Sequence, residues 1–395
     1  MSERPSQMHQ AAIVGGGPAG LATAIALAQA GVATALVARH SPYADNRTTA
    51  LLGGSVDFLE SLNVWQRCSN EAAALRVMRL VDDTRRLIRS PEVRFSSDEI
   101  GLDAFGYNIE NRLLMVAMEE RAAELPNLVR IGDEAQSVDI GDAAVTITTK
   151  EGQSLTVPLA VGADGRHSLC REAAGIGVKR RELGQSALTL NITHARPHQD
   201  SSTEFHTGSG PCVVVPLPGQ RSSIVWVVRH NEAERLMALD DDKLALALER
   251  QSHSILGKLA VVSGRYVFPL AIETPDTLAA RRIVLVGEAA HVMPPIGAQG
   301  LNMGLRDAAD LAPLVRDALL QGGDPGADVV LQRYIRARRA DVFSRIFAVD
   351  VANHTLLSDL LPVQALRAAG MQMLNSVGPI RRFAMREGLS PSWRR

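Results

Sequence analysis

Six residues near the N-terminus have the spacing of a phosphate-binding turn. Gly15-Gly16-Gly17-Pro18-Ala19-Gly20 follows the pattern G-x-G-x-x-G, directly after the β-rich run 12–14. Gly15 permits a tight turn, Gly17 lets the backbone approach a pyrophosphate, and Gly20 lets the next helix pack close to the strand. That helix, beginning at Pro18 and Ala19, then points free N–H groups and a positive dipole at the phosphates. The spacing predicts a dinucleotide site.

One part of the usual dinucleotide fold is missing. The second strand normally ends in Asp or Glu, which binds the ribose hydroxyls. Here the sequence reads Val37-Ala38-Arg39. We expect backbone groups or water to hold the ribose, or Arg39 to make a different cofactor contact, and the case for a tightly held NAD is weakened.

Two further clusters place a carboxylate after a buried strand. Asp164-Gly165 follows the apolar run 159–162, and Gly287-Glu288 follows the run 283–286. At the carboxyl ends of parallel strands, both carboxylates can accept hydrogen bonds from the sugar-like chain of a cofactor.

The last cluster continues into a stiff turn and a helix start. Pro294 and Pro295 lack an N–H and have a fixed φ, so they can form a rigid wall beside a flat ring. The next residues begin a helix whose free N–H groups can stabilise negative charge on that ring; they include Gly297, Gln299, Gly300, Leu301 and Asn302. His291 is predicted to have a structural or cofactor-shell role rather than a catalytic one.

In this order the three clusters resemble the signatures of the single-component FAD-dependent aromatic monooxygenases, the family of para-hydroxybenzoate hydroxylase. Segments 46–51 (NRTTAL) and 107–112 (YNIENR) are similar to segments of the ubiquinone-biosynthesis hydroxylases, which act on polyprenylated phenols. The resemblance implies one bound FAD, contacted also by Arg47 and Arg112, with NAD(P)H as a transient reductant and dioxygen as the oxygen donor. The family usually has Asp where this chain has Glu288, so the longer side chain must retract or bond through water.

Other functions stay open at this point. A related flavin halogenase or prenyl reductase has tryptophan-containing signatures, which Trp65, Trp226 and Trp393 do not form. A flavin-binding scaffold within a quinone-synthesising complex is kept open by Ala38 and Glu288. Phenol-stimulated NAD(P)H oxidation discriminates the enzyme from the scaffold.

Composition excludes several classes of function. The formal net charge of −1 gives no basic field for nucleic acid. The three cysteines are scattered and form no C-x-x-C pair, which argues against a zinc site or a disulfide framework and fits a cytoplasmic protein. We expect no metal and no nucleophilic side chain, since positioning and exclusion of water suffice for flavin chemistry.

These motifs predict an α/β protein in which a Rossmann-type FAD-binding domain carries an inserted antiparallel-sheet domain and a helical C-terminus. We assign residues 1–75, 105–182 and 270–345 to the first domain, 76–104 and 183–269 to the second, and 346–395 to the third region. Helices are expected over 48–62, 111–125 and 242–251 from their apolar spacing. Val215 and Trp226, in β-branched runs of the inserted domain, are candidates to face the aromatic substrate, although half of each strand points away.

The C-terminal region has the composition of a peripheral membrane contact. Apolar residues recur between positions 356 and 374, and the tail has Arg381, Arg382, Arg386, Arg394 and Arg395 against one acid, Glu387. Apolar helices with a basic end suit an anionic bilayer surface, on the inner face of the membrane, or a partner protein. The alternative is that these helices cap the FAD domain and the arginines are solvated.

Overall fold

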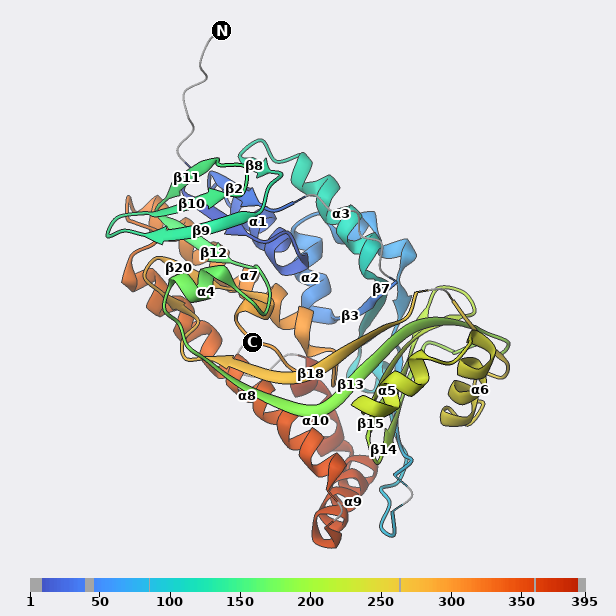
Figure 1. Ribbon diagram of the computed structural model, residues 1–395. Helices are drawn as coiled ribbons and strands as arrows, with labels where there is room; N and C mark the ends of the chain where they lie inside the picture. The colour runs from blue at the N-terminus through green and yellow to red at the C-terminus, as the bar shows by residue number, and fades with distance from the viewer. Residues whose placement is uncertain (1–8, 40–45, 85, 263, 359, 390–395) are drawn as a thin grey trace.

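The computed structural model describes residues 9–39, 46–84, 86–262, 264–358 and 360–389. A parallel sheet with its helices occupies the upper part of Figure 1, and a larger antiparallel sheet lies below it and to the right. The long helix α8 (Asp328–Leu357) runs down one side of the molecule to the last helices. The predicted fold class is confirmed.

The parallel sheet positions the nucleotide motifs. Its strand order is β19-β20-β12-β1-β2-β8, parallel except for β19. The strands are β1 (Ala11–Val14), β2 (Thr34–Val37), β8 (Leu128–Ile131), β12 (Leu159–Gly162), β19 (Ala279–Ala280) and β20 (Ile283–Leu285). Helices of this domain include α1 (Pro18–Gln29), α3 (Asn111–Ala123), α4 (Leu169–Ala173) and α7 (Gln299–Leu320). Because β1, β12 and β20 are neighbours, their carboxyl ends bring the three glycine-containing turns to one edge.

Two small sheets and four short 3₁₀ helices complete this domain and its borders. One sheet joins β3 (Thr48–Leu52), β7 (Gly106–Glu110) and β4 (Ala73–Ala74), and the other joins β9 (Ala135–Ile140), β10 (Val145–Thr149) and β11 (Ser154–Val157). The 3₁₀ helices are η1 (Trp65–Arg67), η2 (Ser69–Glu71), η3 (Ser97–Ile100) and η4 (Gly287–Ala289).

The helix expected over 48–62 is wrong in its first third. Thr48–Leu52 forms strand β3, which pairs with β7, and only α2 (Gly53–Ser61) is helical. Two β-branched threonines favour the strand, and the pairing that fixes it comes from residues more than fifty positions away. The helices expected near 111–125 and 242–251 are confirmed as α3 and α6 (Asp241–Gln251).

The antiparallel sheet forms the second domain. Its order is β17-β13-β16-β15-β14-β5-β6, and β18 also pairs with β13. All these pairs are antiparallel except β14 with β5, which is parallel. The strands are β5 (Val77–Asp82), β6 (Val93–Ser96), β13 (Val178–His194), β14 (Ser201–Thr207), β15 (Gly210–Leu217), β16 (Arg221–Arg229), β17 (Leu259–Val261) and β18 (Tyr266–Pro275). Helices α5 (His230–Met237) and α6 pack on one face, and with it they enclose a hydrophobic core separate from that of the FAD domain.

Two segments inserted into the FAD domain form this sheet, and the first and last residues of each segment lie next to each other. At the ends of the first insertion, the Phe105 N–H donates a hydrogen bond to Leu75 O, and the Leu75 N–H donates one to Gly106 O. In the second, Asp276 N–H donates to Gly177 O over 2.9 Å. The borders predicted near 76 and 104 lie next to the first of these points. Those predicted at 182/183 and 269/270 lie within β13 and β18, which pair as a ribbon as far as Val178 and Pro275.

In the described part of the region predicted over 346–395, the end of α8 is followed by α9 (Leu361–Ser376) and α10 (Gly378–Leu389). None of the described helices has the length and apolar character needed to span a bilayer.

Candidate active site

The glycine-rich turn is held by close backbone approaches. Gly15 has a φ of +111°, and a Cβ there would lie 2.3 Å from Ala163 O. A Cβ on Gly20 would lie 2.1 Å from Gly15 O, whereas a Cβ on Gly17 would meet nothing within 4 Å. Gly15 and Gly20 are therefore required by packing, and the space beside Gly17 is free for a ligand.

The start of α1 leaves its backbone donors available. The helix begins at Pro18, Gly17 provides no side-chain cap, and the first turn contains no acidic residue. The first N–H groups of a helix have no acceptor within it, so this end suits a pyrophosphate.

Arg39 lies just beyond β2 and is paired with a residue that sequence reasoning missed. Its Nε is 3.5 Å from Glu134 Oε1, and its side chain is 61% exposed. Glu134 follows β8, which only the strand order places beside β2. A carboxylate therefore lies near the end of β2, but it comes from the loop after β8, it also pairs with Lys150, and no local motif marks it.

Asp164 has one oxygen used and one unsatisfied. Its Oδ2 accepts from the Cys170 N–H over 3.1 Å, while Oδ1 is buried without a hydrogen-bond partner. A buried acceptor without a donor costs about 1–3 kcal/mol, which a hydroxyl of a bound cofactor can relieve. Gly165 beside it has a φ of +80° and open space at its Cβ position.

Gly287 and Glu288 lie on η4, where a buried network holds the backbone. Asp307 Oδ2 accepts from the Gly287 N–H over 2.9 Å and from His291 Nε2 over 2.8 Å. Glu288 itself is 60% exposed, with its carboxylate 3.7 Å from Arg166 Nε. His291 thus has the structural role predicted for it, behind the cofactor motif.

Arg338 of α8 completes this network. Its guanidinium is fully buried and contacts Asp307 Oδ1 over 2.6 Å and Asp341 Oδ2 over 2.8 Å. Burial by itself raises the pKa of Asp307, but the charges of Arg338 and His291 and the hydrogen bonds from His291 and Gly287 bring that pKa well below its usual range. Asp307 therefore stays ionised and fixes the loop that carries Glu288 to helices α7 and α8.

Helix α7 begins at the cavity edge. Its N-cap, Ala298, is left-handed with a φ of 54°, and no side chain caps the first turn. Asn302 is fully buried and joins α7 to β3, since Oδ1 accepts from the Leu52 N–H and Nδ2 donates to Ala50 O. Gln299 is buried and donates to Gly297 O. The side chains of Gln299 and Asn302 are thus engaged within the protein, while the first-turn N–H groups remain available for a flavin.

A cavity of about 370 Å³ joins the two domains. Its FAD-domain wall includes Arg47, Glu288, Pro295, Gly297, Gly300 and Leu301, and its sheet wall includes Val213, Val215, Val225, Glu204, Phe268 and Leu270. The Arg47 guanidinium lies 5.3 Å from the centre of the Phe268 ring. Residues far apart in the sequence therefore form one mixed apolar and polar chamber.

Several predicted contacts do not line this chamber, among them Gly15, Gly17 and Asp164 of the nucleotide turns. Arg112 lies 3.6 Å from Glu110 and is half exposed, away from the cavity lining. Pro294 is buried behind Pro295, and only Pro295 lines the cavity.

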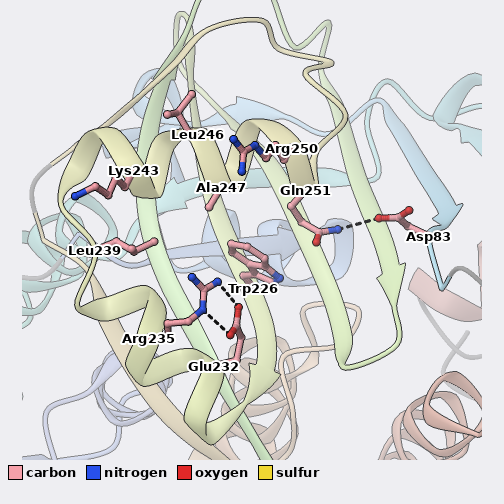
Figure 2. Close-up of a pocket in the computed structure, with 10 residues that line it drawn as sticks. All are labelled: Asp83, Trp226, Glu232, Arg235, Leu239, Lys243, Leu246, Ala247, Arg250 and Gln251. Carbon is pink, nitrogen blue, oxygen red and sulfur yellow. Dashed lines mark hydrogen bonds and ion pairs between the residues drawn. The ribbon is translucent and has the colours of Figure 1, made fainter.

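The candidate substrate contact at Trp226 is wrong. Val215 and Val225 line the cavity, whereas Trp226, next to Val225, points to the opposite face of the sheet. Figure 2 shows Trp226 between α5 and α6, in a second cavity with Glu232 and Arg235. Alternation along β16 fixes this, and the sequence does not reveal which half of the strand faces inward.

Comparison with known proteins identifies the family. The FAD binding domain family model matches residues 8–342. The chain belongs to that family. It is 33% identical to a ubiquinone hydroxylase, UbiL, of Rhodospirillum rubrum, over 95% of this chain and 88% of that protein. It is 28% identical to the 3-demethoxyubiquinol 3-hydroxylase of Escherichia coli, over 98% of this chain and 100% of that protein.

A solved structure shows the same fold. The p-nitrophenol 4-monooxygenase PnpA of Pseudomonas putida superposes with a TM-score of 0.79 at 19% identity, covering 97% of this chain and 98% of that one. This flavoprotein is an FAD-dependent monooxygenase, and NAD(P)H is the typical reductant of its family. The comparisons do not favour the halogenase, reductase or scaffold alternatives.

The residues present fit FAD. The uncapped α1 start suits the pyrophosphate, the unsatisfied Asp164 Oδ1 suits a hydroxyl, and the α7 start borders the chamber. When bound, FAD supplies electrons taken from NAD(P)H and an activated oxygen atom from dioxygen. The chain supplies binding, orientation and exclusion of water.

Proposed function

We propose that this monooxygenase hydroxylates the aromatic ring of a polyprenylated phenol on the route to ubiquinone. One observation carries the proposal: a single chamber has the third cofactor motif, from Glu288 to Leu301, on one wall and a largely apolar strand face on the other. The relatives named above are ubiquinone hydroxylases, which supports this substrate class.

The size of the chamber bears on the prenyl tail. Its volume of about 370 Å³ is near the lower end of pockets that enclose drug-sized ligands, roughly 300–1,000 Å³. Because the flavin ring also occupies part of this space, the chamber holds the substrate ring and the prenyl tail extends beyond it.

The test uses the FAD-loaded protein, NADH or NADPH, and a short-chain 2-prenylphenol. We expect the phenol to stimulate NAD(P)H oxidation and to gain one oxygen atom by mass spectrometry, while prenylbenzene, which lacks the hydroxyl, gains none. In a strain from which the gene is deleted, the structure of the quinone precursor that accumulates identifies the ring position that this enzyme hydroxylates. Reductant oxidation that no prenylphenol stimulates, with no oxygenated product, contradicts the proposal.

We further propose that α9 and α10 contact an anionic membrane surface, on its cytoplasmic side, where a prenylated substrate dissolves. Leu366, Met373 and Phe383 are 73%, 50% and 63% exposed on these helices. Positions 361–389 contain four arginines and one acid, and Arg382 and Arg386 are exposed. Apolar side chains beside cations suit such a surface; Arg394 and Arg395 lie outside the described residues.

Vesicle co-sedimentation tests the membrane contact. The full chain should bind vesicles containing phosphatidylglycerol more than phosphatidylcholine vesicles, and Leu366→Glu with Phe383→Glu should abolish the difference. Phe343→Glu with Phe347→Glu, exposed on α8, is the matched control and should bind as the wild type does. Equal binding by the α9–α10 variant rules out this surface, and a partner protein of a quinone-synthesising complex then becomes the better occupant.

A further inference from the structure

The chamber contains a carboxylate that the binding of FAD does not use. Two acidic residues are among those lining it, Glu204 and Glu288. Glu288 belongs to the cofactor motif and faces Arg166. Glu204 stands on the sheet wall, and its side chain is 18% exposed.

Strand register places Glu204 beside the apolar substrate wall. Val225 of β16 pairs with Val213 of β15, which pairs with Glu204 of β14. Residues directly opposite on antiparallel strands point to the same face of a sheet. Glu204 therefore stands in one row with the two valines that line the chamber.

His206 is bound to this carboxylate from the same strand. Its Nε2 is 2.9 Å from Glu204 Oε1, and its side chain is 20% exposed. Glu204 Oε2 has no hydrogen-bond partner among the described residues. On the neighbouring strand β5, the charged residue in register with His206 is Asp82, which is paired with Arg367 of α9. One carboxylate oxygen is thus oriented by an imidazole and the other remains available.

We propose that Glu204 is the proton acceptor for the phenolic hydroxyl during oxygen transfer, with His206 as its positioning residue. This inference rests on the proposed function. A ring electron pair forms the new carbon–oxygen bond to the outer, electrophilic oxygen atom that reduced FAD and dioxygen supply. The O–O bond breaks, and its electron pair stays on the second oxygen atom, which is protonated and leaves as water. The O–H bond of the phenol breaks, its electron pair forms a ring carbonyl, and the proton passes to Glu204 Oε2.

Rearomatisation closes the proton balance. The ring carbon loses its hydrogen as a proton, which is taken up by the oxygen atom that leaves as water, and the carbonyl oxygen regains a proton from Glu204. The net change is C–H to C–OH, with two electrons from NAD(P)H reducing the second oxygen atom of dioxygen to water. A phenol has a pKa of about 10 and a carboxylate of about 4, so the transfer becomes favourable only as the ring loses electron density.

The test compares Glu204→Gln with the wild type, using 2-prenylphenol as the probe. General-base catalysis contributes roughly 10²–10⁴-fold, so we expect the rate of product formation at pH 7 to fall about 100-fold or more. The dissociation constant for the phenol, measured by flavin absorbance, should stay within about twofold. Raising the pH toward the phenol pKa should restore the rate of Glu204→Gln but change the wild type little, since an ionised phenol no longer needs the acceptor.

Controls separate this role from a structural one. Glu232→Gln, on the other side of the same sheet (Figure 2), should match the wild type. Glu204→Asp should recover part of the rate, and His206→Asn should have a smaller effect than Glu204→Gln. If the wild type makes no hydroxylated product, the proposed function fails and this assignment falls with it. If the wild type is active and Glu204→Gln equals it at pH 7, or is not rescued at high pH, only the assignment of Glu204 is wrong.

Discussion

The two walls of the chamber are built by different means. The FAD-domain wall and the nucleotide turns beside it depend on backbone geometry: glycines that permit close approach, a proline turn and two helix starts. The sheet wall depends on side chains that β13 to β16 present through their register. Backbone requirements restrict residue type at fixed local spacing, whereas a strand face accepts many side chains. The cofactor wall is therefore intolerant of substitution, and the substrate wall can change without loss of the fold.

The largest effect should come from the buried network behind the cofactor wall. Asp307→Ala leaves the buried Arg338 with fewer carboxylates and the Gly287 N–H without its acceptor. We expect the free energy of unfolding in urea to fall by about 3 kcal/mol or more, together with FAD retention. Asp317→Ala, an exposed pair on the same helix, should change it by less than about 0.5 kcal/mol. Similar losses in both variants would show that the network does not support this wall.

Two glycine variants test whether Gly15 of the glycine-rich turn is needed for packing and Gly17 for binding of the cofactor. Gly15→Ala places a Cβ against Ala163 O at a positive φ, so the apoprotein should lose about 2–4 kcal/mol. Gly17→Ala meets no atom within 4 Å, so the apoprotein should keep its melting temperature while FAD binds more weakly. Calorimetry without FAD and FAD titration measure the two quantities. Unchanged FAD affinity in Gly17→Ala contradicts the assignment of that space to the pyrophosphate.

Two neighbours on β16 test the difference between the faces of the sheet. Val225→Phe fills the chamber, so the KM for a prenylphenol should rise about tenfold while FAD content stays normal. Trp226→Phe, on the opposite face, should cost about 1–2 kcal/mol of stability and leave KM unchanged. Steady-state kinetics and thermal unfolding of both variants decide this, and a raised KM only in Trp226→Phe would reverse the assignment of the faces.

The smallest expected effect is the weakening, at low pH, of the ion pairs that attach α9 and α10 to the rest of the protein. Burial raises the pKa of Asp82, but hydrogen bonds from Thr84 and Ser90 and the charge of Arg367 bring it below its ordinary value. A hydrogen bond from Arg381 lowers the pKa of Glu99. Because both folded pKa values are lowered, their stabilisation is present above the unfolded carboxyl pKa of about 4 and is lost as pH falls through the folded values.

Hydrogen exchange of segment 361–389 measures this attachment. Protection should stay constant from neutral pH down to about pH 4.5 and then decrease. Asp82→Asn with Glu99→Gln should lower protection at pH 7 and flatten the pH dependence. A pH-independent wild type would contradict the role of these ion pairs.

The sequence predicts the FAD-domain wall better than the sheet wall. Backbone requirements are visible in local residue spacing, whereas the face that a strand presents depends on its partner strands. Glycine-rich turns and the prolines are local signals, so the strand–turn–helix context of Gly15–Gly20 was readable without a structure. Trp226 was misplaced because the facing of a strand depends on its partners. The sequence does not predict Glu204 at the chamber, because only strand register places it there. It does not predict the pair of Arg39 with Glu134, because only strand order brings the two together. Apolar spacing alone predicts a helix where strand β3 forms, because the partner strand β7 is distant in the sequence.

Because the first and last residues of each insertion lie next to each other, the insertions can be exchanged between homologues. Each insertion leaves the FAD domain and returns to it at nearly the same point, at Leu75 with Phe105 and at Gly177 with Asp276. A chimera that exchanges both segments together therefore needs to match only two short junctions, and the glycine turns and their buried ion network remain in place. Exchanging one segment alone instead splits the sheet between β14 and β5, whose pairing joins the two insertions. The antiparallel sheet is thus built from two separate segments of the chain, and these should be exchanged between relatives together.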